Sequence, residues 1–162
     1  MILIINICKE KLHESEFVKP IEDIVKKIDK VKIVNCQNLT IKEVNNADKI
    51  IIAGTSLKDN DFLMHLDKFS WIKNTNKKIL GICGGAHIIG LVLGYKLKKK
   101  KEIGLKDLGL KKEFLGMKGK MQVYHLHQFY VLPEVYNKGN IYTTLFHPEV
   151  RNKNLIENFV KL

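Results

Sequence analysis

The chain has 162 residues, 45% of them apolar, and this length and composition predict one α/β domain spanning residues 1–162. Three cysteines, an odd number at wide spacing, argue against a disulfide framework and favour a reducing compartment, so we expect a cytoplasmic protein. The opening apolar stretch is too short for a signal sequence, and no apolar run approaches the ~20 residues of a membrane-spanning helix, so no membrane association is expected.

The formal net charge of +11 raises the question of a nucleic-acid partner. Every basic residue except Arg151 is a lysine, whereas recognition of bases and phosphates relies on the two-pronged guanidinium of arginine. We therefore expect no nucleic-acid function. The densest block, Lys98–Lys101, is expected on a solvated loop or an edge strand, with an acidic protein or RNA partner as the alternative.

The first half of the chain is predicted to alternate between buried strands and amphipathic helices. Its apolar runs lack the polar alternation of a half-exposed strand, which is typical of parallel sheets covered on both faces. The expected strands are 1–7, 32–34, 49–53 and 78–82, and the expected helices are 16–28, 40–43 and 62–73. This alternation predicts a three-layer α/β fold with a mostly parallel sheet and helices on both faces.

The second half of the chain has a different pattern of short apolar segments and glycines. The expected strands are 97–101, 103–105, 121–124, 131–132 and 141–146, joined by turns at glycines 104, 109, 116, 119 and 139. A terminal helix is expected over 155–161.

The segment Gly81-Ile82-Cys83-Gly84-Gly85 follows an expected strand and precedes an apolar helix. A strand that passes directly into a helix makes a sharp turn, and glycines two residues to either side of the turn avoid a clash. Such a turn holds Cys83 at a helix N-terminus, where the helix dipole favours the thiolate. The N–H of Gly84 is then placed to serve as an oxyanion donor. The other two cysteines lack this context and are expected only to pack.

Two further pairs of residues follow strand ends. Gly54 and Thr55 lie just after one expected strand, and His147 and Glu149 lie just after another. In an open parallel sheet, sites form at the carboxyl ends of the strands, so we expect these residues beside Cys83. A cysteine, a histidine and a carboxylate supply a nucleophile, a base and a group that orients the base. The sequence predicts a catalytic site of Cys83, His147 and Glu149.

These motifs resemble those of class I (triad) glutamine amidotransferases. Residues 81–87 are similar to the family's Gly-x-Cys-x-Gly-x-Gln turn, and residues 146–149 match its Phe-His-Pro-Glu signature. Residues 124–133 and 155–159 are similar to the region before that signature and to the closing helix, so the resemblance covers nearly the whole chain. It implies the family's flavodoxin-like fold. The likeness is closer to the nucleotide-synthesis branch, especially the separate glutaminase subunit of GMP synthase.

The resemblance also implies a mechanism. Cys83 would attack the side-chain amide carbon of glutamine, His147 would transfer protons, and Glu149 would orient the imidazole. The oxyanion would be held by the N–H of Gly84 and by an N–H of the Gly54–Thr55 turn. Glutamine is the implied substrate, no cofactor is implied, and the ammonia would pass to a separate synthetase subunit.

Three other histidines are assigned to substrate binding. His87 stands where the family has the glutamine that helps to hold the substrate amide. His125 and His127 belong to an expected strand, and we expect one to face the pocket and the other to face solvent. No metal site is expected from these residues and His147, because the chain has no recognisable metal-ligand spacing.

Two departures from the family pattern leave three hypotheses open. His87 replaces a glutamine, and Ala53-Gly54-Thr55-Ser56 replaces the common Ser-Gly-Gly-Pro. The leading hypothesis is a glutaminase subunit that supplies ammonia to a synthetase. The second is a triad hydrolase of another γ-glutamyl amide, and the third is a catalytically impaired relative that serves as a regulatory or binding protein.

Overall fold

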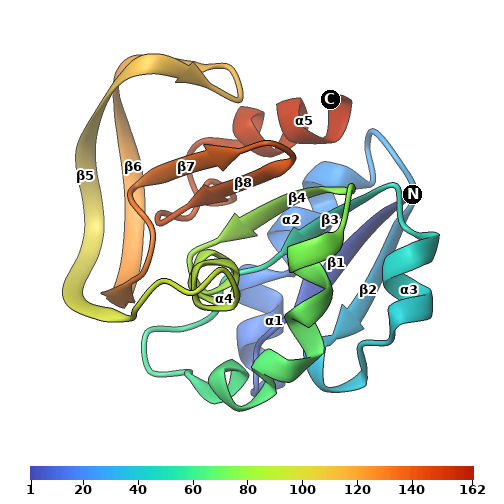
Figure 1. Ribbon diagram of the computed structural model, residues 1–162. Helices are drawn as coiled ribbons and strands as arrows, with labels where there is room; N and C mark the ends of the chain where they lie inside the picture. Colours follow the sequence, from blue (N-terminus) through green and yellow to red (C-terminus); the bar gives the residue numbers. More distant parts are fainter.

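The computed structural model describes residues 1–162. Its centre is a six-stranded sheet in the order β2-β1-β3-β4-β8-β7, with helices on both faces (Figure 1). Neighbouring strands are parallel from β2 to β8, and β7 is antiparallel to β8. A second sheet of two antiparallel strands, β5 and β6, stands beside the β7–β8 edge. The predicted α/β fold with a mostly parallel sheet and helices on both faces is confirmed.

The elements of the central sheet are short. The strands are β1 (Ile2–Asn6), β2 (Val31–Asn35), β3 (Lys49–Ile52), β4 (Lys78–Ile82), β7 (Val135–Lys138) and β8 (Ile141–Thr144). The helices are α1 (Lys11–Phe17), α2 (Lys19–Val25), α3 (Ile41–Asn46), α4 (Gly84–Val92) and α5 (Lys153–Lys161), with 3₁₀ segments η1 (Cys36–Asn38) and η2 (Asp61–Asn74). None of these helices has the length and apolarity to cross a membrane.

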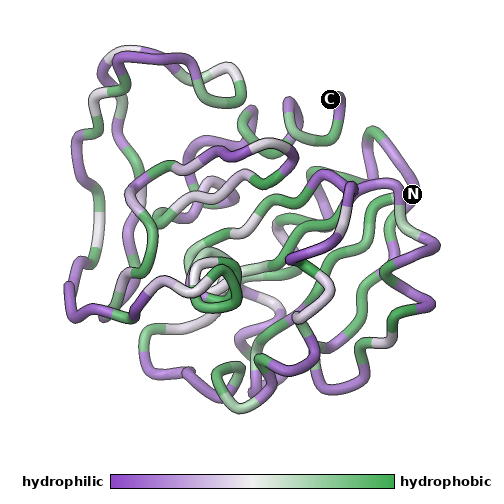
Figure 2. Tube along the Cα trace, in the orientation of Figure 1, coloured by the Kyte–Doolittle hydropathy of each residue, from purple (hydrophilic) through white to green (hydrophobic).

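The core consists of two apolar clusters, one on each face of the sheet. Ile2 and Ile4 of β1 pack with α1, α2 and α5, whereas Leu3 and Ile5 pack with α3, η2 and α4. Successive strand residues point to opposite faces, so a strand buried on both faces needs apolar residues at every position. Figure 2 shows this as continuous apolar colour along the central strands.

Two predicted helices differ from the structure. The predicted helix 16–28 is wrong in its extent, because α1 ends at Phe17 and α2 begins at Lys19. Pro20 lies in the first turn of α2, and its missing N–H prevents one helix from continuing through this point. The predicted helix 62–73 is a 3₁₀ segment, kinked at His65. The capping box of Thr40 and Glu43 is present as predicted.

The predicted strand 141–146 is present as β8, whereas the prediction of several short strands between residues 97 and 132 is wrong. The chain instead forms one long hairpin of β5 (Lys98–Phe114) and β6 (Met117–Tyr130). Three of the predicted turn glycines, at 104, 109 and 119, lie inside these strands, and residues 131–132 form no strand. Lys98–Lys101 is exposed on β5, which pairs only with β6, so the expected edge-strand position is confirmed.

The hairpin is anchored at its tip. Its turn residues Leu115 and Gly116 both have positive φ, 49° and 79°, as in the tight turns that match strand twist. The side chain of Asn158 on α5 donates a hydrogen bond to the carbonyl of Leu115 at 3.0 Å. Glycine suits position 116 because its φ of 79° is one that residues with a Cβ rarely adopt, and a Cβ there would also displace that amide and its hydrogen bond.

Candidate active site

Cys83 occupies a strained turn between β4 and α4. Its φ of 48° and ψ of −100° lie outside the regions that L-residues favour, at a cost of about 1–3 kcal/mol. Its N–H donates to the carbonyl of Thr144 at 2.8 Å, which extends the pairing of β4 with β8 beyond the strand end. The strain is therefore held by the sheet, and the thiol lies at the N-terminus of α4.

Two glycines make this turn possible. A Cβ at Gly81 would lie 2.9 Å from the backbone of Gly85, and one at Gly85 would lie 2.2 Å from the carbonyl oxygen of Ile52. Real Cβ atoms do not approach other atoms so closely, so neither position accepts a side chain. This confirms the steric reason for the Gly-x-Cys-x-Gly spacing.

His147 and Glu149 form a buried pair just after β8. The Nδ1 atom of His147 and the Oε1 atom of Glu149 are 2.7 Å apart, and both side chains are fully buried. The N–H of His147 donates to the carbonyl of Tyr124 at 2.8 Å, which joins this segment to β6. Because the carboxylate accepts a proton from Nδ1, Nε2 is left free, and it has no hydrogen-bond partner in the protein.

Gly54 brings the histidine and the cysteine together. A Cβ at Gly54 would lie 2.6 Å from Cε1 of His147 and 3.5 Å from Cβ of Cys83, so both side chains flank this glycine. Burial by itself would lower the pKa of His147, but the Glu149 carboxylate and the Cys83 thiol raise this pKa well above its usual value. The arrangement favours an imidazolium beside the sulfur, as in an activated cysteine pair.

The other predicted oxyanion residues lie at the same edge. Gly84 is the first residue of α4, where backbone N–H groups have no partner within the helix. Thr55 is buried, and its hydroxyl donates to Oδ2 of Asp59 at 2.7 Å. Asp59 also accepts a hydrogen bond from the backbone N–H of Lys9 at 2.8 Å. No local pattern in the sequence indicates Asp59, because its role depends on these remote partners.

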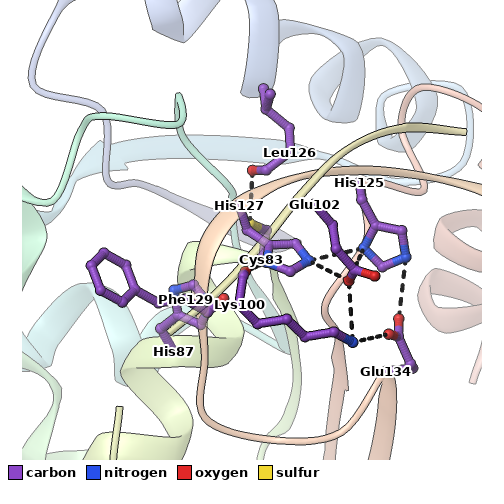
Figure 3. A network of polar contacts seen from close by, with 9 residues as sticks. All are labelled: Cys83, His87, Lys100, Glu102, His125, Leu126, His127, Phe129 and Glu134. Atoms are coloured by element: carbon purple, nitrogen blue, oxygen red, sulfur yellow. Dashed lines mark hydrogen bonds and ion pairs between the residues drawn. The ribbon is translucent and has the colours of Figure 1, made fainter. Parts of the chain in front are cut away.

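A small cavity adjoins the thiol. Thr55, Gly84, His87 and Leu126 are among its lining residues together with Cys83, and its volume is about 20 Å³. The Sγ atom of Cys83 donates to the carbonyl of Leu126 at 3.6 Å (Figure 3). Such a cavity has room for about one water molecule, so an amino-acid substrate requires this edge to open.

His87 lines that cavity as a neutral side chain. Burial lowers its pKa to about 4, and its Nε2–H donates to the carbonyl of Phe129 at 3.0 Å. Because a neutral imidazole has one donor and one acceptor nitrogen, Nδ1 of His87 is left as an acceptor. The predicted position of His87 near the nucleophile agrees with the structure, and its role in substrate binding stays a prediction.

The expectation that His125 and His127 face opposite ways is wrong. Both are buried, and His125 Nδ1 lies 3.0 Å from His127 Nε2. Side chains alternate between the two faces of a strand, so residues two apart, such as these histidines, share a face. Leu126, between them, lines the cavity, whereas neither histidine does. Their predicted contact with substrate therefore has no support in the geometry.

The remaining cysteines behave as the sequence predicts. Cys8 and Cys36 are both buried, and burial raises the pKa of Cys8 to about 12 and that of Cys36 to about 11. Neither is a thiolate at neutral pH, so both are packing residues.

Comparisons with known proteins agree with this geometry. The family model for class-I glutamine amidotransferases matches residues 13–144. The chain belongs to this family. The amidotransferase is 28% identical to the HisH subunit of imidazole glycerol phosphate synthase from Methanocaldococcus jannaschii, over 90% of this chain and 94% of that protein. The predicted family and the prediction of an amidotransferase-type enzyme are confirmed.

Solved structures show the same fold. A crystal structure from Thermoplasma acidophilum, described as that of a candidate GMP synthase subunit, superposes with a TM-score of 0.82 at 21% identity. The superposition covers 99% of the amidotransferase and 92% of that chain. A glutamine amidotransferase from Thermotoga maritima gives a TM-score of 0.63 at 16% identity, over 99% and 80% of the two chains. The predicted fold of the family is therefore confirmed.

Proposed function

We propose that this amidotransferase is a glutaminase subunit that hydrolyses the side-chain amide of glutamine through a triad of Cys83, His147 and Glu149. The observation that carries the proposal is the buried pair of His147 and Glu149, 2.7 Å apart, beside the glycine that Cys83 also flanks. A nucleophile, a base and an orienting carboxylate at one sheet edge form the arrangement that acyl transfer needs.

The first half of the reaction forms a thioester. His147 Nε2 holds the proton of the Cys83 thiol as an imidazolium, and the thiolate sulfur attacks the amide carbon. The resulting oxyanion accepts hydrogen bonds from the N–H of Gly84 and from an N–H of the Gly54–Thr55 turn. The imidazolium then gives its proton to the departing nitrogen, and the carbon–nitrogen bond breaks to release ammonia.

The second half regenerates the thiol. Water loses a proton to His147 and attacks the γ-glutamyl thioester carbon, and glutamate leaves as the carbon–sulfur bond breaks. Throughout, Glu149 fixes the Nδ1–H tautomer of the imidazole and stabilises its charged form. The pKa of His147, raised by this carboxylate and by Cys83, suits a group that holds the thiol proton until the nitrogen departs.

The proposal includes a separate partner that uses the ammonia. The relative from Methanocaldococcus jannaschii and the Thermoplasma acidophilum protein are both named as subunits of synthases. The matches cover 94% and 92% of those two chains. We therefore expect a synthetase subunit to dock near the catalytic edge and to receive the ammonia.

A second candidate is a hydrolase of another γ-glutamyl amide. Its support is His87, which offers one acceptor, Nδ1, in the cavity, where a glutamine side chain would offer both a donor and an acceptor. This difference in hydrogen-bonding groups would change which amide substrate the cavity accepts. It would leave the proposed nucleophile and base unchanged.

The test is covalent labelling by a diazo-ketone analogue of glutamine, measured by intact mass. Labelling that requires Cys83 and that free glutamine suppresses is the expected result. Cys83→Ala must abolish labelling by the analogue, and His147→Gln must strongly slow this labelling. Cys36→Ala is the matched control, because it removes a buried cysteine of high pKa and must leave labelling unchanged.

The alternatives give different results. Rapid reaction of Cys83 with a small alkylating agent, without labelling by the analogue, favours the second candidate. Equal reactivity of Cys83 in the parent and His147→Gln proteins contradicts the triad.

A further inference from the structure

A second cluster of polar side chains lies beside the catalytic edge. Glu102 on β5 is paired directly with His127 on β6, and His125 is two residues earlier on the same face of β6. We call Glu102, His125 and His127 the His–Glu cluster. Figure 3 shows these three side chains pointing toward one another, with Glu134 on the far side of His125. One donor atom from each lies within 4.8 Å of the other two.

The spacing of these atoms fits a tetrahedral metal ion. His125 Nδ1 to His127 Nε2 is 3.0 Å, His127 Nε2 to Glu102 Oε2 is 3.2 Å, and His125 Nδ1 to Glu102 Oε2 is 3.7 Å. Nitrogen and oxygen ligands about 2.0–2.1 Å from a zinc ion in tetrahedral geometry are about 3.3–3.4 Å from one another. The three observed separations lie on both sides of that value.

Both histidines are oriented by acceptors at their other nitrogen. His127 Nδ1 donates to the carbonyl of Lys100 at 2.9 Å, which leaves Nε2 as a lone pair facing Glu102. His125 Nε2 lies 3.3 Å from a carboxylate oxygen of Glu134, which favours a proton on Nε2 and a lone pair on Nδ1. Carbonyl and carboxylate acceptors of this kind orient most histidines that bind metals in proteins.

With both imidazoles neutral and both carboxylates ionised, no arrangement of protons satisfies the His–Glu cluster. With the proton of His125 on Nε2, two imidazole lone pairs and a carboxylate oxygen converge without a donor among the three. With that proton on Nδ1, the lone pair on Nε2 faces the Glu134 carboxylate. Oε2 of Glu102 has no hydrogen-bond donor within the His–Glu cluster, and the cation beside it is the Lys100 ammonium at 3.2 Å.

We propose that the His–Glu cluster binds one divalent transition-metal ion of the zinc type through Glu102 Oε2, His125 Nδ1 and His127 Nε2. Two imidazoles and one carboxylate form a known zinc ligand set, which leaves one tetrahedral position for water. The sequence predicts no metal here, because the third ligand comes from the neighbouring strand and its place depends on the register of the hairpin.

Lys100 acts as the counter-ion of the metal-free form. Its ammonium lies 3.2 Å from Glu102 and 3.3 Å from Glu134, and its side chain is 43% exposed. Because the side chain reaches solvent, it moves away when a divalent ion neutralises Glu102. The metal would also fix the carbonyl of Leu126, which lies between the two histidines and accepts the hydrogen bond of the Cys83 thiol. The site thereby stiffens one wall of the catalytic cavity.

The experiment is a titration of the metal-free chain with Zn²⁺ against a chromophoric chelator. The chain carries Cys83→Ala, so that the thiol contributes no ligand. We expect one ion per chain. Glu102→Gln and His127→Ala each lower the affinity at least about tenfold, and Glu134→Gln lowers it about 10–100-fold. His65→Ala is the control, because it removes another histidine beside a carboxylate, 3.6 Å from Asp61, and leaves binding unchanged.

Two further measurements make the result decisive. Co²⁺ in place of Zn²⁺ gives the visible absorption of a four-coordinate ion in the parent chain and loses it in Glu102→Gln. Circular dichroism reports folding. If His127→Ala unfolds, Glu102→Gln decides alone, because glutamine keeps the shape of glutamate on a largely exposed strand. No saturable binding by the parent chain, or equal binding by Glu102→Gln, overturns the proposal. This test does not depend on the proposed glutaminase activity.

Discussion

At the scale of single residues, the turn that holds Cys83 was predictable because its strand–turn–helix pattern is local in the sequence. A Cβ at Gly81 would meet the backbone of Gly85, four residues along the chain, so the spacing carries this part of the information, whereas the clash at Gly85 is with Ile52 of β3. Asp59 and Glu102 were not predictable, because their partners come from other elements. His125 and His127 were assigned the wrong directions, although the strand period of two places them on one face.

The Glu149 carboxylate has a specific electrostatic role that substitution tests. Glu149→Gln keeps the shape and removes the charge, so the pKa of His147 falls from its raised value. We expect kcat for glutamine hydrolysis to drop on the order of 10⁴-fold, as when the carboxylate of a triad becomes an amide. Steady-state assays measure the rate, and NMR titration of the imidazole measures the pKa.

Glu113→Gln provides the matched control for that substitution, since it removes a carboxylate from an exposed position on β5. Glu113→Gln should change neither kcat for glutamine hydrolysis nor the pKa of His147. An unchanged pKa of His147 in Glu149→Gln contradicts the assigned role of the carboxylate.

His87 makes the fold sensitive to acid. Its pKa in the folded chain, about 4, is below the value of about 6.5 expected when unfolded, so protonation favours unfolding. The contribution is fully present above pH 6.5 and is lost as the pH falls toward 4, on the order of 3 kcal/mol in total. His87→Gln cannot titrate, so it should lose less stability than the parent chain over this range. Urea unfolding at both ends of the range measures the difference.

The control is His65→Gln, which removes a less buried histidine and should retain the parent's acid sensitivity. Equal losses of stability in the parent and His87→Gln proteins contradict this account.

At the scale of elements, the parallel strands of the central sheet could be predicted, whereas its antiparallel edge strand β7 and the hairpin could not. Buried parallel strands such as β1 and β4 are marked by continuous apolar runs. The length of β5 and β6 depends on cross-strand pairing, which carries the strands through glycines that would otherwise predict turns. The division between α1 and α2 depends on Pro20, whose effect the apolar spacing does not reveal.

The packing of α4 against β3 gives a prediction at this scale. Gly85→Ala places a Cβ 2.2 Å from the carbonyl oxygen of Ile52, so the helix must move from the strand. We expect the free energy of unfolding to fall by about 1–3 kcal/mol or more, and Cys83 to lose its turn geometry. Urea denaturation measures the free energy of unfolding, and the alkylation rate of Cys83 reports the geometry of its turn.

Gly109→Ala is the control, because a Cβ at that position meets no atom within 4 Å and its φ is negative or extended. It should change stability by less than about 0.5 kcal/mol. A Gly85→Ala protein as stable as Gly109→Ala contradicts the steric account of the turn.

At the scale of the whole molecule, the lysine block and the three residues of the proposed triad lie on different elements. The four lysines of Lys98–Lys101 are exposed on the hairpin, whereas Cys83, His147 and Glu149 are buried at the carboxyl edge of the sheet. Figure 2 shows polar colour where β5 begins, at the outer end of the hairpin. A partner drawn to the hairpin would therefore reach the cavity through β6, which contributes Leu126 to it. The single domain over residues 1–162 and the cytoplasmic location stay predictions.

The closed catalytic edge leads to a prediction about the loop after β3. Asp59 holds this loop through the hydroxyl of Thr55 and the backbone N–H of Lys9. Asp59→Ala removes both hydrogen bonds, each worth about 0.5–1.5 kcal/mol, so the cavity opens more often. We expect a small alkylating agent to label Cys83 roughly tenfold faster, measured by intact mass over time, since 1.4 kcal/mol corresponds to about tenfold. Asp67→Ala, exposed on η2, is the control. Equal labelling rates in the two variants mean that this loop does not limit access to the nucleophile.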